Sequence, residues 1–163
     1  MKVYIITLLS LIPFLAYPQK TLEKVKFYGD TKARISSGVA IPEGKKLFII
    51  SGIVASAIDT TKPSGSRERY GDTKTQAVSI LSKIQSQLQE AGLSMKDVVN
   101  LKAFVTPDKL NNGNFDFKGW NEAYDTFFNN PGNPVKPTRI TMGIPILTNP
   151  EFLIEIEGMA VYP

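Results

Sequence analysis

The sequence of 163 residues contains no cysteine and no histidine. Without an imidazole, Ser-His-Asp and Cys-His catalysis are both excluded. Structural zinc sites of the usual Cys/His type are excluded as well. No spaced carboxylate motif for an all-oxygen cation site is present, so we expect neither a metal nor a cofactor. Any chemistry must therefore use carboxylates, Arg, Lys, Tyr, Ser, Thr, backbone dipoles or water.

The sequence also lacks long charge runs. Lys and Arg number 19 against 15 Asp and Glu, for a net charge of +4, and the nearest thing to a basic cluster is the pair Lys45-Lys46. This indicates a solvated, mildly basic surface, and nucleic acid is not an expected partner. Hydrophobic residues make up 42% of the chain, enough for one compact core in a single domain.

Residues 1–19 differ in composition from the rest of the chain. A basic second residue precedes a largely apolar run over residues 3–16, which is shorter than the ~20 residues of a transmembrane span. The pattern predicts a signal peptide followed by one domain, residues 20–163. Phe14 stands two positions before Ala16, where a cleavage site favours a small residue, so an uncleaved N-terminal anchor is the alternative. We expect an exported protein, periplasmic or secreted, with no membrane contact after removal of the leader.

A long amphipathic helix is predicted between Asp72, a plausible N-cap, and Ala91. Gly92 follows at the position where a C′ glycine ends a helix. The apolar residues of this segment recur at helical spacing and form one stripe: Ala77, Ile80, Leu81, Ile84, Leu88 and Ala91.

The remaining elements alternate between strand and helix. Pro42-Glu43-Gly44 separates two apolar segments and predicts a hairpin. The expected order is strands 37–41 and 47–51, the long helix, strand 99–105, helix 117–128, and strands 138–146 and 152–161. This order predicts an α+β fold in which two helices cover one face of a single sheet.

The last two strands carry the candidate chemistry. Side chains alternate between the two faces of a strand, which separates Arg139 from Ile140 and Glu155 from Ile156. If the Ile-rich faces meet the helices, Arg139 and Glu155 lie on the other side of the sheet. One hypothesis is a structural Arg–Glu pair across strands or subunits. The other is an arginine that binds a carboxylate ligand bidentately, with a nearby carboxylate that orients water.

Several segments resemble, in order and spacing, the reactive intermediate deaminase family (Rid, also called YjgF or L-PSP). The resemblance extends from Ser51-Gly52 to Val161, and its most specific part is the C-terminal segment. The segments are Ile50-Ser51-Gly52, Glu90-Ala91-Gly92-Leu93, Asp97-Val98-Val99, Phe104-Val105, Trp120-Asn121-Glu122-Ala123-Tyr124, Phe127-Phe128, Pro137-Thr138-Arg139 and Ile154-Glu155-Ile156-Glu157-Gly158-Met159-Ala160-Val161.

The resemblance implies a chorismate-mutase-like fold and a homotrimer with a ligand cleft at each subunit boundary. It implies that Arg139 binds the carboxylate of a small 2-imino or 2-keto acid and that Glu155 positions the hydrolytic water. The backbone at Thr141 and Gly52 is implied to line the same cleft. The implied activity is hydrolysis of reactive 2-imino or 2-enamino acids to 2-keto acids.

Two other functions stay open. The deaminating members of the family that this chain resembles usually have a tyrosine where Ile35 stands. Its absence here favours a non-catalytic module that binds small carboxylates. An endoribonuclease activity is the third hypothesis, and the sequence shows no acid–base pair suited to RNA cleavage.

Overall fold

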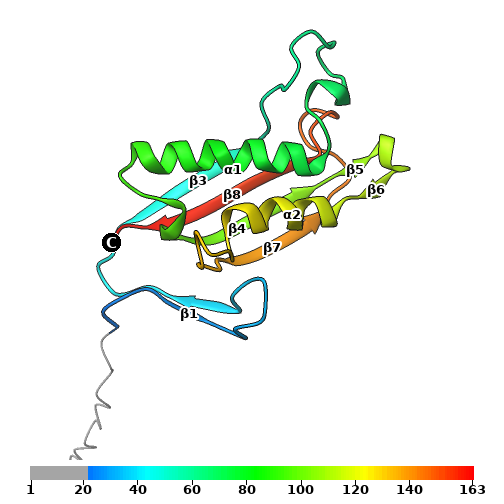
Figure 1. Ribbon diagram of the computed structural model, residues 1–163. Coiled ribbons are helices and arrows are strands. Elements are labelled where there is room, and N and C mark those ends of the chain that lie inside the picture. The colour runs from blue at the N-terminus through cyan, green and yellow to red at the C-terminus, as the bar shows by residue number, and fades with distance from the viewer. Residues whose placement is uncertain (1–21) are drawn as a thin grey trace, which may run out of the picture.

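A computed structural model describes residues 22–163, so the expected signal peptide, residues 1–19, lies outside the described residues. Two helices, α1 (Thr73–Glu90) and α2 (Phe117–Phe127), pack on one face of a four-stranded sheet (Figure 1). The sheet order is β3-β8-β4-β7, from β3 (Leu47–Ile53), β8 (Ile154–Val161), β4 (Val98–Val105) and β7 (Thr138–Gly143). The expected α+β fold with both helices on one face is confirmed. Within residues 22–163, no helix is long and apolar enough to cross a membrane.

The sheet is mixed. β8 runs antiparallel to both of its neighbours, β3 and β4, and β4 runs parallel to β7. A parallel pair needs a crossover connection, and α2 lies on the segment that joins β4 to β7. The strands β3, β4 and β7 therefore run in the same direction, and their C-terminal ends lie at the same end of the sheet.

Local signals set the ends of α1 as expected. The side chain of Asp72 accepts a hydrogen bond from the Thr75 backbone N–H at 2.7 Å, which caps the helix. Gly92 has φ +73° just beyond the end of the helix, a conformation that glycine adopts without strain. The expected stripe is buried against the sheet, with Ala77, Ile80, Leu81, Ile84 and Leu88 all fully buried.

The aromatic residues of α2 form part of the core. Trp120, Tyr124 and Phe128 are fully buried, whereas Phe127 is only partly buried. The rings of Trp120 and Tyr124 meet edge to face with centroids 5.9 Å apart. Trp120 and Tyr124 thus belong to the core, and both rings also border the site described below.

The expected hairpin between residues 37–41 and 47–51 is wrong. β2 (Gly38–Ala40) pairs antiparallel with β1 (Lys26–Tyr28), and β3 pairs with β8 instead. The pairing with β8 buries Ile50 in the core, whereas β2 is too short to offer a comparable partner. The β1–β2 hairpin lies beyond the β7 edge of the sheet (Figure 1), where Ser36 bridges Thr138.

Two insertions project where β3, β4 and β7 end (Figure 1). The first is the loop of residues 54–72, which contains the short helix η1 (Arg67–Arg69). The second is the segment 106–117, which contains β5 (Pro107–Asp108), η3 (Lys109–Asn111) and β6 (Asn114–Phe115). A further short helix, η2 (Met95–Asp97), precedes β4. The insertions bring residues far apart in sequence to one end of the sheet.

Candidate functional site

Arg139 lies on the helix-covered face of the sheet, so the expectation that it shares the open face with Glu155 is wrong. In the β4–β7 register Arg139 is opposite Leu101, which is fully buried under the helices. Ile140 points to the other face and is 49% exposed. The reason is the composition of α2: its aromatic rings accept a cation, and the guanidinium carbon lies 4.6 Å from the ring centroid of Tyr124.

Of the two terminal nitrogens of the Arg139 guanidinium, one has a hydrogen-bond partner and the other has none among residues 22–163. Nη2 donates to the side-chain oxygen of Asn121 at 2.7 Å. Nη1 is buried and has no hydrogen-bond partner among residues 22–163. Burial lowers the pKa of Arg139, but a guanidinium stays protonated at neutral pH. A buried charged donor without a partner is rare in folded proteins and indicates a place for an anionic ligand.

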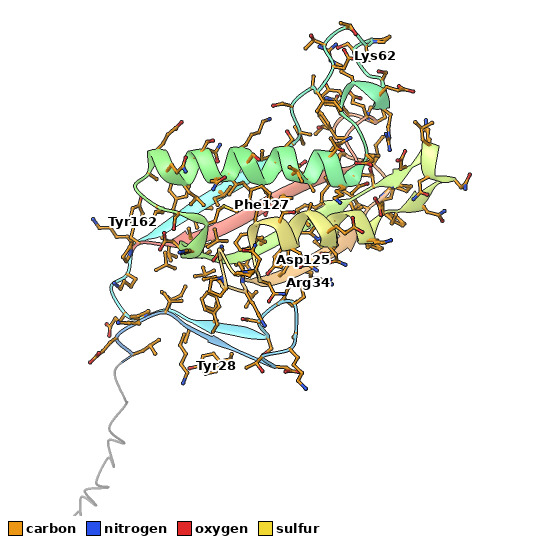
Figure 2. All side chains as sticks on the ribbon, in the orientation of Figure 1. Tyr28, Arg34, Lys62, Asp125, Phe127 and Tyr162 are labelled. Carbon is orange, nitrogen blue, oxygen red and sulfur yellow. The ribbon has the colours of Figure 1, made fainter. Side chains whose placement is uncertain are left out.

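The ring of Tyr124 lies against the Arg139 guanidinium and is uncharged. Burial raises the pKa of Tyr124 to about 12, so the phenol keeps its proton at physiological pH. Its hydroxyl donates to the Arg34 carbonyl at 3.4 Å, and Arg34 in turn pairs with Asp125 at 2.9 Å. Figure 2 shows Arg34 and Asp125 close together between the β1–β2 hairpin and α2. This contact fixes the hairpin against the helix beside Arg139.

A pocket of about 200 Å³ opens at Arg139 and is lined by Phe117, Trp120, Asn121, Arg139 and Thr141. The Thr141 hydroxyl accepts a hydrogen bond from the indole N–H of Trp120 at 2.9 Å, which fixes both side chains. The sequence predicted Arg139 and Thr141 for the site but not Phe117 or Asn121. The helical pattern of α2 indicates its buried face, and it gives no signal for the residues that border β7.

Gly52 and Glu155 form a second close contact. A Cβ added at Gly52 would lie 1.9 Å from Glu155 Oε1, so any other residue forces Glu155 to move. The pairing of β3 with β8 shifts register between Ile50 and Ile53, so the strand is irregular in the segment that contains Gly52. Glu155 stands between the fully buried Ile154 and Ile156, and therefore faces the open side of the sheet.

The predicted site residues thus form two pairs in one chain. Arg139 and Thr141 lie on the helix face at β7, and Gly52 and Glu155 lie on the open face at β3 and β8, with β4 between them. An Arg–Glu ion pair within one chain is therefore excluded for these two residues. The described part of the chain, residues 22–163, shows no group of three or more carboxylates placed to hold a metal ion.

Comparison with known proteins agrees with the fold and with these segments. The family model described as Endoribonuclease L-PSP matches residues 32–162. A RutC family protein of Pyrococcus horikoshii is 33% identical over 121 residues, which are 74% of this chain and 82% of the relative. A RutC family protein of Aquifex aeolicus is 35% identical over 89 residues, which are 54% of this chain and 63% of the relative. The match thus spans less than two thirds of the Aquifex protein.

Solved structures show the same architecture. The Rid family protein YyfB of Yersinia pestis superposes with a TM-score of 0.64 at 20% identity, over 85% of this chain and 99% of that chain. TdcF of E. coli, solved with bound serine, superposes with a TM-score of 0.56 at 26% identity, over 85% of this chain and 99% of that one. The architecture and the matched segments together define a small α+β protein with the chorismate-mutase-like fold. The chain belongs to the Rid/YjgF/L-PSP family.

Proposed function

We propose that the protein hydrolyses reactive 2-imino acids, and the 2-enamino acids that tautomerise to them, to 2-keto acids and ammonia. The observation that carries the proposal is that Arg139 lines a pocket while its buried Nη1 has no hydrogen-bond partner in residues 22–163. A carboxylate is the natural partner of such a donor, because hydrogen bonds between charged groups are strong and directional. TdcF, at 26% identity, was solved with serine, a ligand that carries a carboxylate, and this supports the choice of ligand class.

A complete site requires a second copy of the chain, because Arg139 and Glu155 face opposite sides of one sheet. The open face also carries apolar side chains without a cover in the described chain, with Ile49 64% exposed and Ile140 49% exposed. Exposed apolar surface of this kind is characteristic of protein interfaces. We infer a homotrimer in which Arg139 and Thr141 of one copy meet Gly52 and Glu155 of the next.

The proposed reaction needs little beyond positioning. Arg139 holds the substrate carboxylate, and Glu155 accepts a proton from a water molecule as that water attacks the imine carbon. The new C–O bond forms while the C=N π electrons move to nitrogen, which takes up the proton that Glu155 has accepted. In the resulting carbinolamine, Glu155 takes the hydroxyl proton and passes it to the nitrogen. The C–N bond then breaks, ammonia leaves, and the carbonyl of the keto acid forms. Positioning and electrostatic stabilisation are the main sources of rate in such a site.

A non-catalytic carboxylate-binding module is the second candidate, and one observation favours it. Ile35 is partly buried and packs against the core. It stands at the position where deaminating members of the family usually have a tyrosine. It supplies no hydroxyl to the pocket. A binding module would use Arg139 in the same manner and would not need Glu155 to activate water.

The deciding experiment generates 2-imino acids in situ with an amino acid oxidase and measures keto-acid release above the spontaneous rate. We expect acceleration by the wild-type protein and its loss in Glu155→Gln, with affinity for 2-ketobutyrate retained. Glu157→Gln is the matched control, because Glu157 lies on the same face and pairs only with the exposed Lys102 at 3.3 Å in the described chain. Keto-acid binding without acceleration by wild type would instead establish the binding module.

A further inference from the structure

The insertion 106–117 places two phenylalanine rings beside the Arg139 pocket. Phe115 and Phe117 stack with centroids 5.6 Å apart and planes inclined by 8°. The two residues are 39% and 41% exposed, respectively, so the stack is partly open to solvent. Phe117 also lines the pocket that contains Arg139.

The rings follow the row of side chains on β7 that begins with Arg139. Arg139, Thr141 and Gly143 share one face of the strand, at spacings of about 6.6 Å. The Phe115 ring covers Gly143, since a Cβ there would lie 2.9 Å from Phe115 Cε1. A ligand whose carboxylate binds Arg139 and whose side chain extends along this row therefore reaches the aromatic stack.

The insertion is anchored at its base. The carboxylate of Asp108 is 4% exposed and accepts a hydrogen bond from Arg67 Nη2 at 2.7 Å, which ties the insertion to the loop 54–72. Its other oxygen accepts from the Leu110 backbone N–H at 2.9 Å. At the other end, Asp116 caps α2 by accepting from the Gly119 N–H at 2.8 Å. Phe115 lies between these anchors and Phe117 directly follows the second as the first residue of α2. An apolar wall that is already in position favours ligand binding.

We propose that Phe115 and Phe117 form the side-chain subsite of the Arg139 pocket and select 2-imino and 2-keto acids with an aromatic side chain over small ones. This inference rests on the proposed carboxylate site and specifies its substrate class. Binding sites of this kind combine an apolar wall with a few polar groups that fix orientation. Offset stacking of a ligand ring on Phe117 adds to the burial of apolar surface.

The test compares pyruvate, 2-ketobutyrate and phenylpyruvate by calorimetry on the purified, assembled protein. We expect wild type to bind phenylpyruvate about tenfold or more tightly than pyruvate, from ring stacking and apolar burial together. Phe117→Ala should reduce phenylpyruvate affinity much more than pyruvate affinity and so remove this preference, and Phe117→Tyr should keep it. Leu110→Ala is the control, because Leu110 is 63% exposed elsewhere on the same insertion.

The outcomes separate the inference from the proposed function. If wild type binds all three acids alike, or if Phe117→Ala weakens all three equally, the aromatic subsite is wrong and the carboxylate site stands. If no keto acid binds wild type, or if Arg139→Ala binds them as wild type does, the proposed function fails and the subsite fails with it. A loss of phenylpyruvate affinity in Phe117→Ala that is much larger than any loss of pyruvate affinity supports both.

Discussion

Arg139 donates through Nη2 to the side-chain oxygen of Asn121, which lies 2.7 Å away on the facing side of α2. The same guanidinium lies 5.2 Å from the ring centroid of Trp120 and 4.6 Å from that of Tyr124. The helix therefore fixes the plane of the fork, and the buried Nη1 has no hydrogen-bond partner among residues 22–163. In the proposed site Asn121 acts on the ligand through Arg139 and is therefore a positioning residue.

Asn121→Ala should weaken binding of 2-ketobutyrate by roughly 3- to 10-fold, the effect of losing one hydrogen bond that orients a charged group. Asn121→Asp should weaken it more, because a second carboxylate then competes with the ligand for the same guanidinium. Calorimetry measures both. Glu122→Gln is the control, since Glu122 is exposed and pairs with Lys74 at 2.8 Å. Equal affinities in all three variants would contradict the positioning role.

Replacing Arg139 tests the carboxylate contact directly. Arg139→Ala should reduce the free energy of keto-acid binding by about 1.5–3 kcal/mol, the scale of a hydrogen bond to a charged group. Arg139→Lys should restore only part of the affinity, because an ammonium lacks the planar fork. Arg34→Ala removes the neighbouring arginine, which pairs with Asp125 at the surface, and should leave affinity unchanged. Unchanged affinity in Arg139→Ala would show that Arg139 is purely structural.

The sequence predicted those parts of the fold that depend on local signals. Asp72 and Gly92 mark the ends of α1 by their own chemistry, and the apolar stripe between them indicates the buried face. The partner of β2 was not predictable in this way, because pairing with β1 or β3 is a choice between distant segments. The prediction of the sheet face on which Arg139 lies failed for a related reason. The alternation of side chains separates Arg139 from Ile140, but it does not show which of the two faces α2 covers.

Gly52 offers a test of the second pair of site residues. Gly52→Ala should lower turnover at least tenfold and affinity much less, because its Cβ would lie 1.9 Å from Glu155 Oε1 and displace that carboxylate. Gly38→Ala is the matched control, since a Cβ there meets no atom of the described residues within 4 Å. The imine-hydrolysis assay and calorimetry on both variants decide the matter. Full activity in Gly52→Ala would show that the position of Glu155 is unimportant.

The anchor of the aromatic insertion should also matter for stability. Asp108→Ala removes a buried carboxylate that accepts from Arg67 and Leu110, and it should lower the free energy of unfolding by about 1–3 kcal/mol. Asp125→Ala breaks the ion pair with Arg34, in which the Asp125 side chain is 39% exposed and the Arg34 side chain 45% exposed. This substitution should change the free energy of unfolding by less than about 1 kcal/mol. Urea unfolding at one protein concentration compares the two. Similar values for both variants would mean that the anchor contributes no more than a surface ion pair.

The proposed assembly is tested by charging the open face of the sheet. Ile49 is 64% exposed on β3 and faces the side of the sheet away from the helices, next to Met159 in the β3–β8 register. If three copies bury this face, Ile49→Lys places an ammonium in an apolar interface, and the charge has no partner there. Sedimentation at micromolar concentration should then show a trimer for wild type and a smaller species for Ile49→Lys. If the site combines residues of two copies as proposed, keto-acid binding should weaken together with assembly.

Ile146→Lys is the control for the added charge. Ile146 is 63% exposed, nearly the same fraction as Ile49, but it lies in the loop after β7 and not on the open face. It should sediment as wild type does, which would attribute the effect at Ile49 to its place in the interface and not to lysine itself. A wild-type monomer at these concentrations would contradict the trimer and remove the intersubunit cleft. A trimeric Ile49→Lys variant with full keto-acid affinity would show instead that the subunits associate through another surface. In that case Arg139 and Glu155 would have to meet across a different boundary or act independently.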